Sequence, residues 1–329
     1  MAKTDKQKKA KAPTNAQIVK AMNDKFGKGT VMLLGSQEVV DWPSISTTSI
    51  GLDRALGIGG LPQGRITEIF GWESSSKTTI AMHVMAQAQA MGLTAAIVDA
   101  EHAFDPQYAE SLGIDIDALF INQPSSGEEG LNVVQAFVEQ GIGVVVVDSV
   151  AALVPRAEIE GAMGDSKMGL HARMMSQAMR KLAAKTAQSN TCLIFINQIR
   201  HKIGVMFGNP EVTTGGNALK FWASVRIETR RKAKPNEEQG EAASNTVTAR
   251  VIKNKLAPPF KKAVFDVRYG TGIDWLGEVF DIAIDSGFII QKGSWFSYED
   301  TKIGQGRESA IQTLNDNEEF LQELMAKIT

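Results

Sequence analysis

Continuously apolar runs alternate with amphipathic, helix-length segments through the middle of the chain. The apolar runs have the length of buried strands and comprise residues 65–70, 95–98, 144–147 and 191–196. The helix-length segments between them are residues 77–91, 130–140 and 169–188. Apolar strands separated by helices are typical of a parallel sheet covered on both faces. The pattern therefore predicts an α/β core with a mostly parallel sheet.

The two ends of the chain depart from this pattern. Residues 15–26 carry apolar side chains at helical spacing and are followed by glycines, which predicts a helix. Residues 31–34 have the composition of a short strand. After about residue 272 the composition predicts a small α+β unit, with core candidates Trp275, Phe280, Ile282, Ile284, Trp295 and Phe296. We expect three parts: residues 1–36, 37–272 and 273–329.

Composition narrows the classes of function. The chain has 329 residues and a formal net charge of -2, so nucleic-acid binding requires local basic patches. Its single cysteine, Cys192, lies in an apolar run and is expected to be a buried, unreactive thiol. The lysine-rich start has no apolar run, and no stretch approaches the roughly 18 apolar residues of a membrane span. These features predict a cytoplasmic protein without membrane contact.

Three segments interrupt the core pattern. Residues 156–168 and 199–216 contain glycine and lack periodicity, and the second is long for a loop inside a compact domain. Residues 232–244 are polar and hairpin-like. Long irregular segments are usually functional, or else the secondary-structure assignment is wrong.

A near match to a phosphate-binding loop lies between a predicted strand and a predicted helix. It consists of Gly71, Trp72, Glu73, Ser74, Ser75, Ser76, Lys77 and Thr78. In such a loop, backbone N–H groups cradle the phosphates, Lys77 reaches the β and γ phosphates, and Thr78 binds Mg²⁺. Ser76 departs from the pattern, because glycine there allows an unusual φ. The alternative interpretation is a serine-rich turn between strand and helix.

Polar residues follow three other predicted strands. Asp148 follows four valines, as a carboxylate that holds Mg²⁺ through water would. Glu101 lies just past a strand end, where it could polarise an attacking water, and Gln198 could sense the γ-phosphate. Each residue alone could be a simple polar strand end. Together with the near match at residues 71–78 they favour an ATPase.

At this point several segments resemble the bacterial RecA recombinases, and the resemblance covers nearly the whole chain. These segments are residues 101–106, 147–153, 169–182, 195–200, 204–210 and 214–221. The resemblance implies a RecA-like P-loop NTPase core, in which residues 1–36 serve polymerisation and residues 273–329 gather duplex DNA. Trp72 and Ser76 replace the proline and glycine usual in this family's loop, as in a phage-encoded or divergent copy.

The resemblance also implies roles at the nucleotide site, with ATP and Mg²⁺ as cofactors. Thr79 would join the phosphate loop, and Asp105, Tyr108 and Tyr269 would lie near the adenine. Glu101 would activate the water. Lys253 and Lys255 would reach the phosphates of a neighbouring subunit's ATP, so that the site is complete only in a polymer. Without the resemblance, the simpler interpretation is that these two lysines lie on the solvent-exposed face of a strand.

The two irregular segments correspond to the family's DNA-binding loops, around residues 156–168 and 199–213. A single strand would be held by charge and by apolar side chains inserted between bases. The DNA-binding candidates are Arg173, Ser176, Arg180, Arg200, Ile203, Val205, Met206, Phe207, Gly215, Gly216, Asn217, Arg230, Arg231 and Arg250. Arg230, Arg231 and Arg250 resemble the family's second site, for the incoming duplex.

The resemblance thus implies an ATP-dependent recombinase that forms helical filaments on single-stranded DNA, exchanges strands with homologous duplex DNA and promotes self-cleavage of LexA-type repressors. One alternative is a filament scaffold that binds ATP without hydrolysing it, because of Ser76. Another is a ring-forming helicase with the same core. Phosphate release stimulated by DNA separates the first alternative, and electron microscopy of rings or filaments separates the second.

Overall fold

The computed structural model describes residues 13–33, 42–162, 169–202, 204, 208, 210–232 and 244–328. The chain divides into two compact units, residues 1–41 and residues 42–329. Within the described ranges, no helix combines the length and the apolar character needed to cross a bilayer. The three predicted domain boundaries stay predictions.

The first unit contains the helix α1, Asn15–Phe26, as predicted. Thr14 and Gln17 form a capping box at its start, and Gly27 ends it with φ 107°. The strand predicted at residues 31–34 is wrong for its described part, Val31 to Leu33. Asn23 takes both backbone groups of Val31, accepting from its N–H at 2.9 Å and donating to its carbonyl at 3.0 Å. Leu34 lies outside the described residues.

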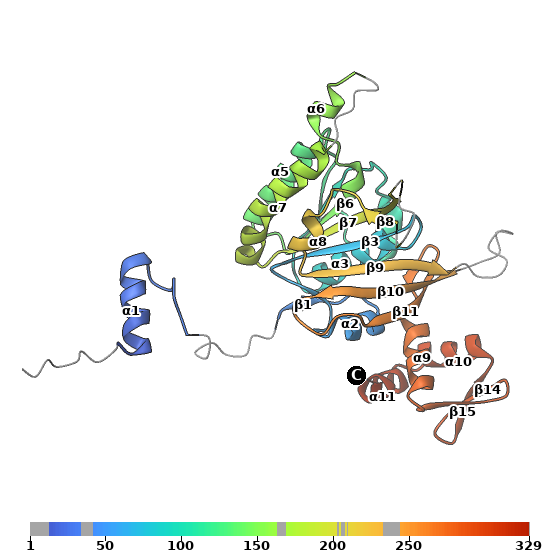
Figure 1. Ribbon diagram of the computed structural model, residues 1–329. Coiled ribbons are helices and arrows are strands. Elements are labelled where there is room, and N and C mark those ends of the chain that lie inside the picture. The colour runs from blue at the N-terminus through green and yellow to red at the C-terminus, as the bar shows by residue number, and fades with distance from the viewer. Residues whose placement is uncertain are drawn as a thin grey trace, which may run out of the picture. The chain divides into compact units, whose positions relative to one another are not determined.

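Within the described part of the second unit, ten strands form the main sheet (Figure 1). Their order is β12-β11-β10-β9-β3-β7-β6-β4-β5, and β8 pairs with β7. The strands β3 to β7 and β9 are parallel, whereas β8 and β10 to β12 pair antiparallel. The bounds are β3 Arg65–Gly71, β4 Ala95–Asp99, β5 Leu119–Asn122, β6 Val144–Asp148, β7 Cys192–His201, β8 Glu211–Thr213, β9 Val225–Lys232, β10 Ser244–Asn254, β11 Lys262–Arg268 and β12 Gly272–Ile273.

Helices cover both faces of this sheet, and α5 and α7 lie side by side on one of them (Figure 1). The bounds are α2 Ile50–Leu56, α3 Lys77–Ala90, α4 Pro106–Ser111, α5 Gly127–Glu139, α6 Arg156–Ile159, α7 Leu170–Ser189 and α8 Ala218–Trp222, with a 3₁₀ turn η2 at Val150–Ala152. The short strands β1, Ser44–Ile45, and β2, Leu61–Pro62, form a separate pair.

The continuously apolar strands are buried on both faces, as predicted. Val144 and Val146 belong to the core cluster under α3, whereas Val145 and Val147 belong to the cluster under α5 and α7. Cys192 is likewise fully buried, and burial raises the pKa of its thiol to about 12. The prediction of a buried thiol is confirmed, and its lack of reactivity stays a prediction.

Most predicted elements match observed ones within a few residues, and the irregular segments differ more. The helix predicted at 130–140 is α5, which starts at Gly127 behind its cap Ser126. The prediction that residues 199–216 are irregular is wrong in part, because β7 continues to His201 and pairs with β8. The first irregular segment begins with α6, and its residues 163–168 lie outside the described residues. Around the third, β9 and β10 form the arms of a hairpin whose residues 233–243 are not described.

The end of the chain is a small α+β unit, as predicted. Its elements are α9 Trp275–Asp285, β13 Ile289–Lys292, β14 Trp295–Tyr298, β15 Thr301–Gln305, α10 Arg307–Asn315 and α11 Glu318–Ile328. Phe280 and Phe296 are buried and meet edge to face at 5.1 Å. The prediction of Trp295 as a core residue is wrong: the residue is 39% exposed, and the Lys302 ammonium lies over its ring, 4.8 Å from the centroid.

Glu278 on α9 attaches this unit to the core. Its Oε1 accepts from the Ser49 hydroxyl at 2.8 Å and the Gly51 N–H at 2.9 Å, and its Oε2 accepts from the Ile50 N–H at 3.1 Å. The carboxylate thus receives donors at the start of α2, where helix N–H groups lack partners. Burial raises the pKa of Glu278 despite these bonds.

Replacing Glu278 should loosen this attachment. Glu278→Gln substitutes an amide donor for one accepting oxygen, which leaves at least one buried donor unpaired and lowers the free energy of unfolding by about 1–3 kcal/mol. Asp285→Asn, an exposed site on the same helix, is the matched control. Urea unfolding of both variants measures the difference, and equal stabilities would contradict the assigned role.

His83 on α3 should make the fold sensitive to acid. Its Nε2 accepts from the Ile273 N–H at 2.9 Å, and burial lowers its pKa from 6.5 to about 4. Between these values the unfolded chain binds a proton that the fold does not, so stability is full above pH 6.5 and falls as the pH approaches 4. From pH 7 to pH 5 the loss should be about 2 kcal/mol.

The variant His83→Gln keeps an acceptor for Ile273 and cannot titrate. Urea unfolding at the two pH values should therefore show a smaller loss in His83→Gln than in the native chain. His102→Gln, at an exposed histidine, should keep the full loss. An equal loss in the native chain and in His83→Gln would refute the assignment.

Candidate nucleotide and DNA sites

The predicted phosphate loop joins β3 to α3. Gly71 ends β3 where no side chain fits, because a Cβ there would lie 2.3 Å from the Thr229 carbonyl oxygen. Ser76 has φ 62° and ψ 27°, in the left-handed region that favours glycine. The serine therefore adopts the conformation for which the usual glycine is suited. Such a conformation costs roughly 1–2 kcal/mol in a residue with a side chain.

Lys77, the first residue of α3, is buried beside the loop. Its ammonium donates to the Trp72 carbonyl at 2.7 Å. Burial lowers its pKa, while the carboxylates of Asp148, Glu101 and Glu73 oppose that shift. The cation therefore lies among acidic groups on a loop of backbone N–H donors, an arrangement that suits a polyphosphate.

The carboxyl ends of the parallel strands bring the other predicted residues to the same edge. In register, Gln198 pairs with Gly71, and Asp148 pairs with Asp99. The Thr78 hydroxyl donates to Asp148 Oδ2 at 2.7 Å. The pKa of Asp148 is raised to about 6, mainly by burial and also by the neighbouring carboxylates Glu101 and Asp99, whereas the Thr78 hydrogen bond and Lys77 lower it.

Glu101 lies at the centre of a hydrogen-bonded chain. Its Oε1 accepts from the Ser149 hydroxyl at 2.5 Å and from Gln198 Nε2 at 2.7 Å. The Arg200 guanidinium in turn donates to Gln198 Oε1 at 2.5 Å. A continuous path thus runs from the carboxylate to the end of β7. Ser149 was missed by the sequence reasoning, although its position directly after Asp148 was a signal.

Asp99 and Asn197 support the hydrogen-bonded chain around Glu101 through further hydrogen bonds. Asp99 accepts from the N–H groups of Ala103 and Phe104, so it shapes the turn that carries Glu101. Asn197 donates to the buried Glu68 at 2.8 Å and accepts from the Gln198 N–H at 2.9 Å. Glu68 also forms an ion pair with Arg226. The backbone of Gln198 is therefore supported by a buried polar network.

A cavity of about 370 Å³ opens beside the phosphate loop. It is lined by residues 74–79 together with Tyr108, Arg231, Asn245, Val267, Arg268, Tyr269 and Gly270. Tyr108 and Tyr269 are thus brought together as predicted, and the Tyr108 hydroxyl lies 3.2 Å from Thr79 Oγ1. Asn245 and Arg268 were missed, because nothing local marks them. Arg231, a DNA-binding candidate, lies on this cavity wall.

Asp105, Lys253 and Lys255 lie outside that cavity lining. The Asp105 carboxylate caps α4 by accepting from the N–H groups of Gln107 and Tyr108. In the sheet register, Lys253 lies opposite Arg226 on β9. Arg226 comes three residues before Thr229, the residue that lies opposite Gly71 at the start of the phosphate loop. Its ammonium donates to the carbonyls of Lys220 and Phe221 at 2.6 and 2.9 Å. Lys253 therefore points away from the phosphate loop of its own chain, and Lys255 is exposed.

The predicted DNA-binding residues lie on several different elements. Arg173 and Arg180 are exposed on α7, where Ser176 is half-buried. Gly215 and Gly216 have φ 77° and 73°, and a Cβ on Gly216 would lie 2.8 Å from that of Ala172. Asn217, at the start of α8, is exposed. Ile203, Val205, Met206 and Phe207 lie outside the described residues.

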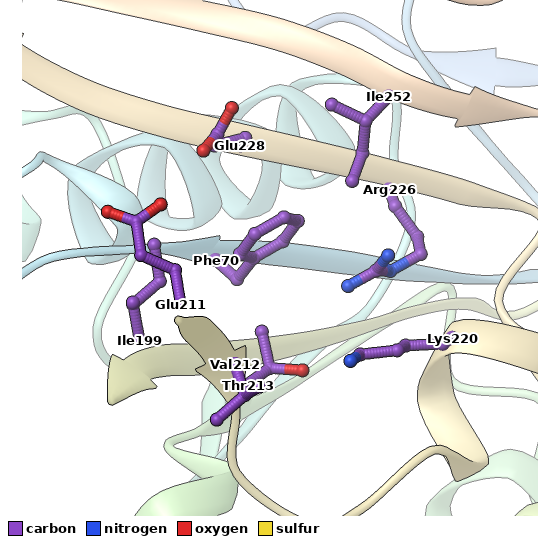
Figure 2. A pocket seen from close by; sticks show the side chains of 9 residues that line it. All are labelled: Phe70, Ile199, Glu211, Val212, Thr213, Lys220, Arg226, Glu228 and Ile252. Carbon is purple, nitrogen blue, oxygen red and sulfur yellow. The ribbon is translucent and has the colours of Figure 1, made fainter. Parts of the chain in front are cut away.

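Arg230 and Arg250 are engaged in ion pairs. Arg230 donates to Glu211 on β8 and to Glu228 on its own strand, and these bonds raise its pKa. Arg250 lies 3.7 Å from Glu228. Both carboxylates line a second cavity of about 290 Å³. Figure 2 shows them on one side of Phe70, with the cationic ends of Arg226 and Lys220 on the other.

Comparison with known proteins agrees with this geometry. The RecA N-terminal domain family matches residues 14–274, and the RecA C-terminal domain family matches residues 277–329. Protein RecA of Cytophaga hutchinsonii is 57% identical over 92% of this chain and 86% of its own length. Protein RecA of Rhodospirillum rubrum is 56% identical over 97% of this chain and 86% of its own length.

A solved structure of the RadB recombinase has the same fold. It matches with a TM-score of 0.53 at 24% identity, covering 70% of this chain and 98% of that one. The relatives share most of the chain at more than half identity, and both parts of the chain match the corresponding RecA domains. The protein therefore belongs to the RecA family of ATP-dependent recombinases, which are DNA-dependent ATPases of DNA recombination and repair.

Proposed function

We propose that the protein binds ATP with Mg²⁺ at the phosphate loop, assembles as filaments on single-stranded DNA and exchanges that strand with a homologous duplex. The observation that carries the proposal is the convergence of Lys77, Thr78, Asp148, Glu101 and Gln198 at one edge of the sheet. From that edge, Arg200 extends the hydrogen-bonded path toward the segment that resembles a DNA-binding loop. Nucleotide and DNA would thus act on a single polar path.

The donor set at this edge fits Mg²⁺. The hydroxyl of Thr78 and the carboxylate of Asp148 lie within hydrogen-bonding distance, and hard oxygen ligands of this kind suit the ion. When bound, Mg²⁺ would neutralise charge on the β and γ phosphates. Thr78 would hold it directly, and Asp148 would hold it through water. Lys77 would exchange its carbonyl partner for a phosphate oxygen.

Glu101 would accept the proton of the attacking water. Two donors, the Ser149 hydroxyl and the Gln198 amide, hold its carboxylate in one orientation. Orientation of a general base within hydrogen-bond reach is what this step requires. Because Gln198 also accepts from Arg200, displacement of the β7 end on DNA binding would shift Glu101 as well. This linkage would make hydrolysis depend on DNA.

Lys253 and Lys255 would complete the site of a neighbouring protomer. The direction of Lys253, toward α8 and away from its own phosphate loop, supports this role. Hydrolysis would then follow assembly, since a lone protomer lacks these cations at its phosphates. ATP bound between protomers would in turn favour the filament.

The remaining partners follow from the family resemblance. Arg173, Ser176, Arg180 and Arg200, with Ile203, Val205, Met206, Phe207 and the residues Gly215 to Asn217, would hold the single strand. Arg230, Arg231 and Arg250 would meet the incoming duplex, once Glu211 releases Arg230 and Glu228 releases Arg230 and Arg250. Promotion of LexA-type repressor self-cleavage and a cytoplasmic location belong to the same proposal.

Glu101→Gln tests the assigned chemistry. The amide oxygen can still accept from Ser149 and Gln198, but it cannot take a proton, so hydrolysis stimulated by single-stranded DNA should fall about 10²–10⁴-fold. Phosphate release with and without poly(dT) measures the change, and Glu110→Gln at an exposed site on α4 is the control. If the native protein itself shows no DNA-stimulated release, the scaffold alternative replaces the proposal.

Ser76 should not block the site, because it already adopts the left-handed conformation. Ser76→Gly should keep hydrolysis and change the KM for ATP by less than about tenfold, the equivalent of roughly 1.4 kcal/mol. Ser76→Val, whose branched side chain disfavours this φ, should raise the KM by more than about tenfold. Steady-state kinetics with saturating poly(dT) compares the three proteins. A gain of about a hundredfold or more in Ser76→Gly would show that the serine suppresses turnover.

A further inference from the structure

We propose that Trp72 is a positioning residue that couples the phosphate loop to the β7–β8 hairpin, so that DNA held at the hairpin changes the affinity for ATP. This inference rests on the proposed function, because it needs a nucleotide at the loop and DNA at the hairpin. It assigns a role to the residue at which the loop departs from the family pattern.

The side chain of Trp72 contacts both strands of the hairpin. Its indole Nε1 donates to Glu211 Oε1 at 3.0 Å. Its ring lies 4.8 Å from the His201 ring, centroid to centroid, at an angle of 43°. His201 and Glu211 face each other in the β7–β8 register. The indole is therefore attached to a single rung of the hairpin, the pair of residues that directly precedes Lys202 and follows Pro210.

Glu211 is itself fixed to the main sheet. Arg230 donates to both of its carboxylate oxygens and also to Glu228, so Glu211 is held from β9. Its side chain is only 17% exposed, which limits competition from water. Figure 2 shows the Glu211 carboxylate beside Phe70, the residue that precedes Gly71. A hydrogen bond to a held, partly buried carboxylate is stronger and more directional than one to a mobile surface group.

The main chain of Trp72 connects the same residue to the phosphate-binding lysine. Its carbonyl accepts from Lys77 Nζ at 2.7 Å and from the Ser75 hydroxyl at 2.7 Å. A displacement of the indole by the hairpin would therefore move the carbonyl that holds Lys77. The coupling runs from hairpin to indole, from indole to carbonyl, and from carbonyl to ammonium. A proline at this position would offer neither the indole N–H nor an aromatic ring.

This path is separate from the one through Gln198. The Gln198 path ends on the water-activating carboxylate and bears on kcat, whereas the Trp72 path ends on a phosphate-binding cation and bears on ATP affinity. A merely structural Trp72 would change stability and basal turnover but would leave the response of ATP affinity to DNA intact. The two possibilities therefore differ in a measurable ratio.

The test compares the dissociation constant of a non-hydrolysable ATP analogue without DNA and with saturating poly(dT), in the full chain with Mg²⁺. We expect poly(dT) to lower this constant in the native protein, and Trp72→Phe to shrink the ratio of the two constants by about fivefold. Trp42→Phe is the matched control, because that indole stacks on Arg65 at the opposite end of β3. Glu211→Gln keeps an accepting oxygen for the indole and should retain most of the ratio, whereas Glu211→Ala should lose it.

A double-variant cycle separates the coupling from damage to the loop. The loss in Trp72→Phe/Glu211→Ala should be no larger than in either single variant, because both remove the same bond. Should Trp72→Phe fail to bind ATP at all, Glu211→Ala and His201→Leu leave the loop sequence intact and should each shrink the ratio. Tryptophan emission that shifts on adding poly(dT) should lose that shift in Trp72→Phe and keep it in Trp42→Phe.

The outcomes distinguish this inference from the function on which it rests. If the native ratio persists in Trp72→Phe and Glu211→Ala, the coupling is absent while the recombinase function stands. Additive losses in the double variant would equally overturn the inference. If poly(dT) stimulates neither binding nor hydrolysis in the native protein, the proposed function fails first.

Discussion

Burial of the parallel strands on both faces is the constraint on which the rest of the structure depends. Val144 to Val147 are fully buried, and the strand turns polar at Asp148, where it reaches the edge of the sheet. The neighbouring strands reach the same edge in register, so their terminal side chains meet without any loop having to bring them together. A rigid sheet thus sets the positions of the chemical groups, and the loops adjust the details.

A buried carboxylate interrupts the apolar pattern of β3. Glu68 is fully buried in β3 and would be costly alone, but Arg226 and Asn197 supply its partners from the two adjacent strands. Asn197 carries the connection onward by accepting from the backbone of Gln198. The interior of the sheet and the nucleotide edge therefore share one polar network. A substitution of Glu68 would therefore affect the position of Gln198 as well as the packing of the core.

The periodicity of the chain was sufficient to predict the sheet, its covering helices and the edge at which the chemistry lies. The apolar runs are long, and their terminal polar residues are unambiguous. The hairpin of β7 and β8 was not predictable, because Glu211 to Thr213 pair with residues beyond an irregular segment, and such pairing leaves no periodic signal. The prediction of a strand near Val31 was wrong, because the Asn23 side chain forms hydrogen bonds with both backbone groups of Val31.

At the candidate site, the residues with a local signature were found and those without one were not. Asp148 and Glu101 lie at or just past strand ends, and Lys77 lies in the loop motif after β3. Asn245 and Arg268 instead reach the cavity from β10 and β11, far along the chain. The family resemblance, carried by runs of consecutive residues, supplied Tyr108 and Tyr269, which no spacing rule would have joined. Asp105 caps α4 with its carboxylate, and its place near the adenine stays a prediction.

The alternation of the two core layers has a consequence for how neighbouring residues share stability. Val145 and Val146 are adjacent in sequence, yet they face opposite layers and have no packing partners in common. Truncating each would open a separate void under a different set of helices. Their energetic effects should therefore behave as independent increments, although non-additivity is the usual expectation for sites in direct succession. In a sheet covered on both faces, residues adjacent in sequence can therefore contribute independently to the free energy of unfolding.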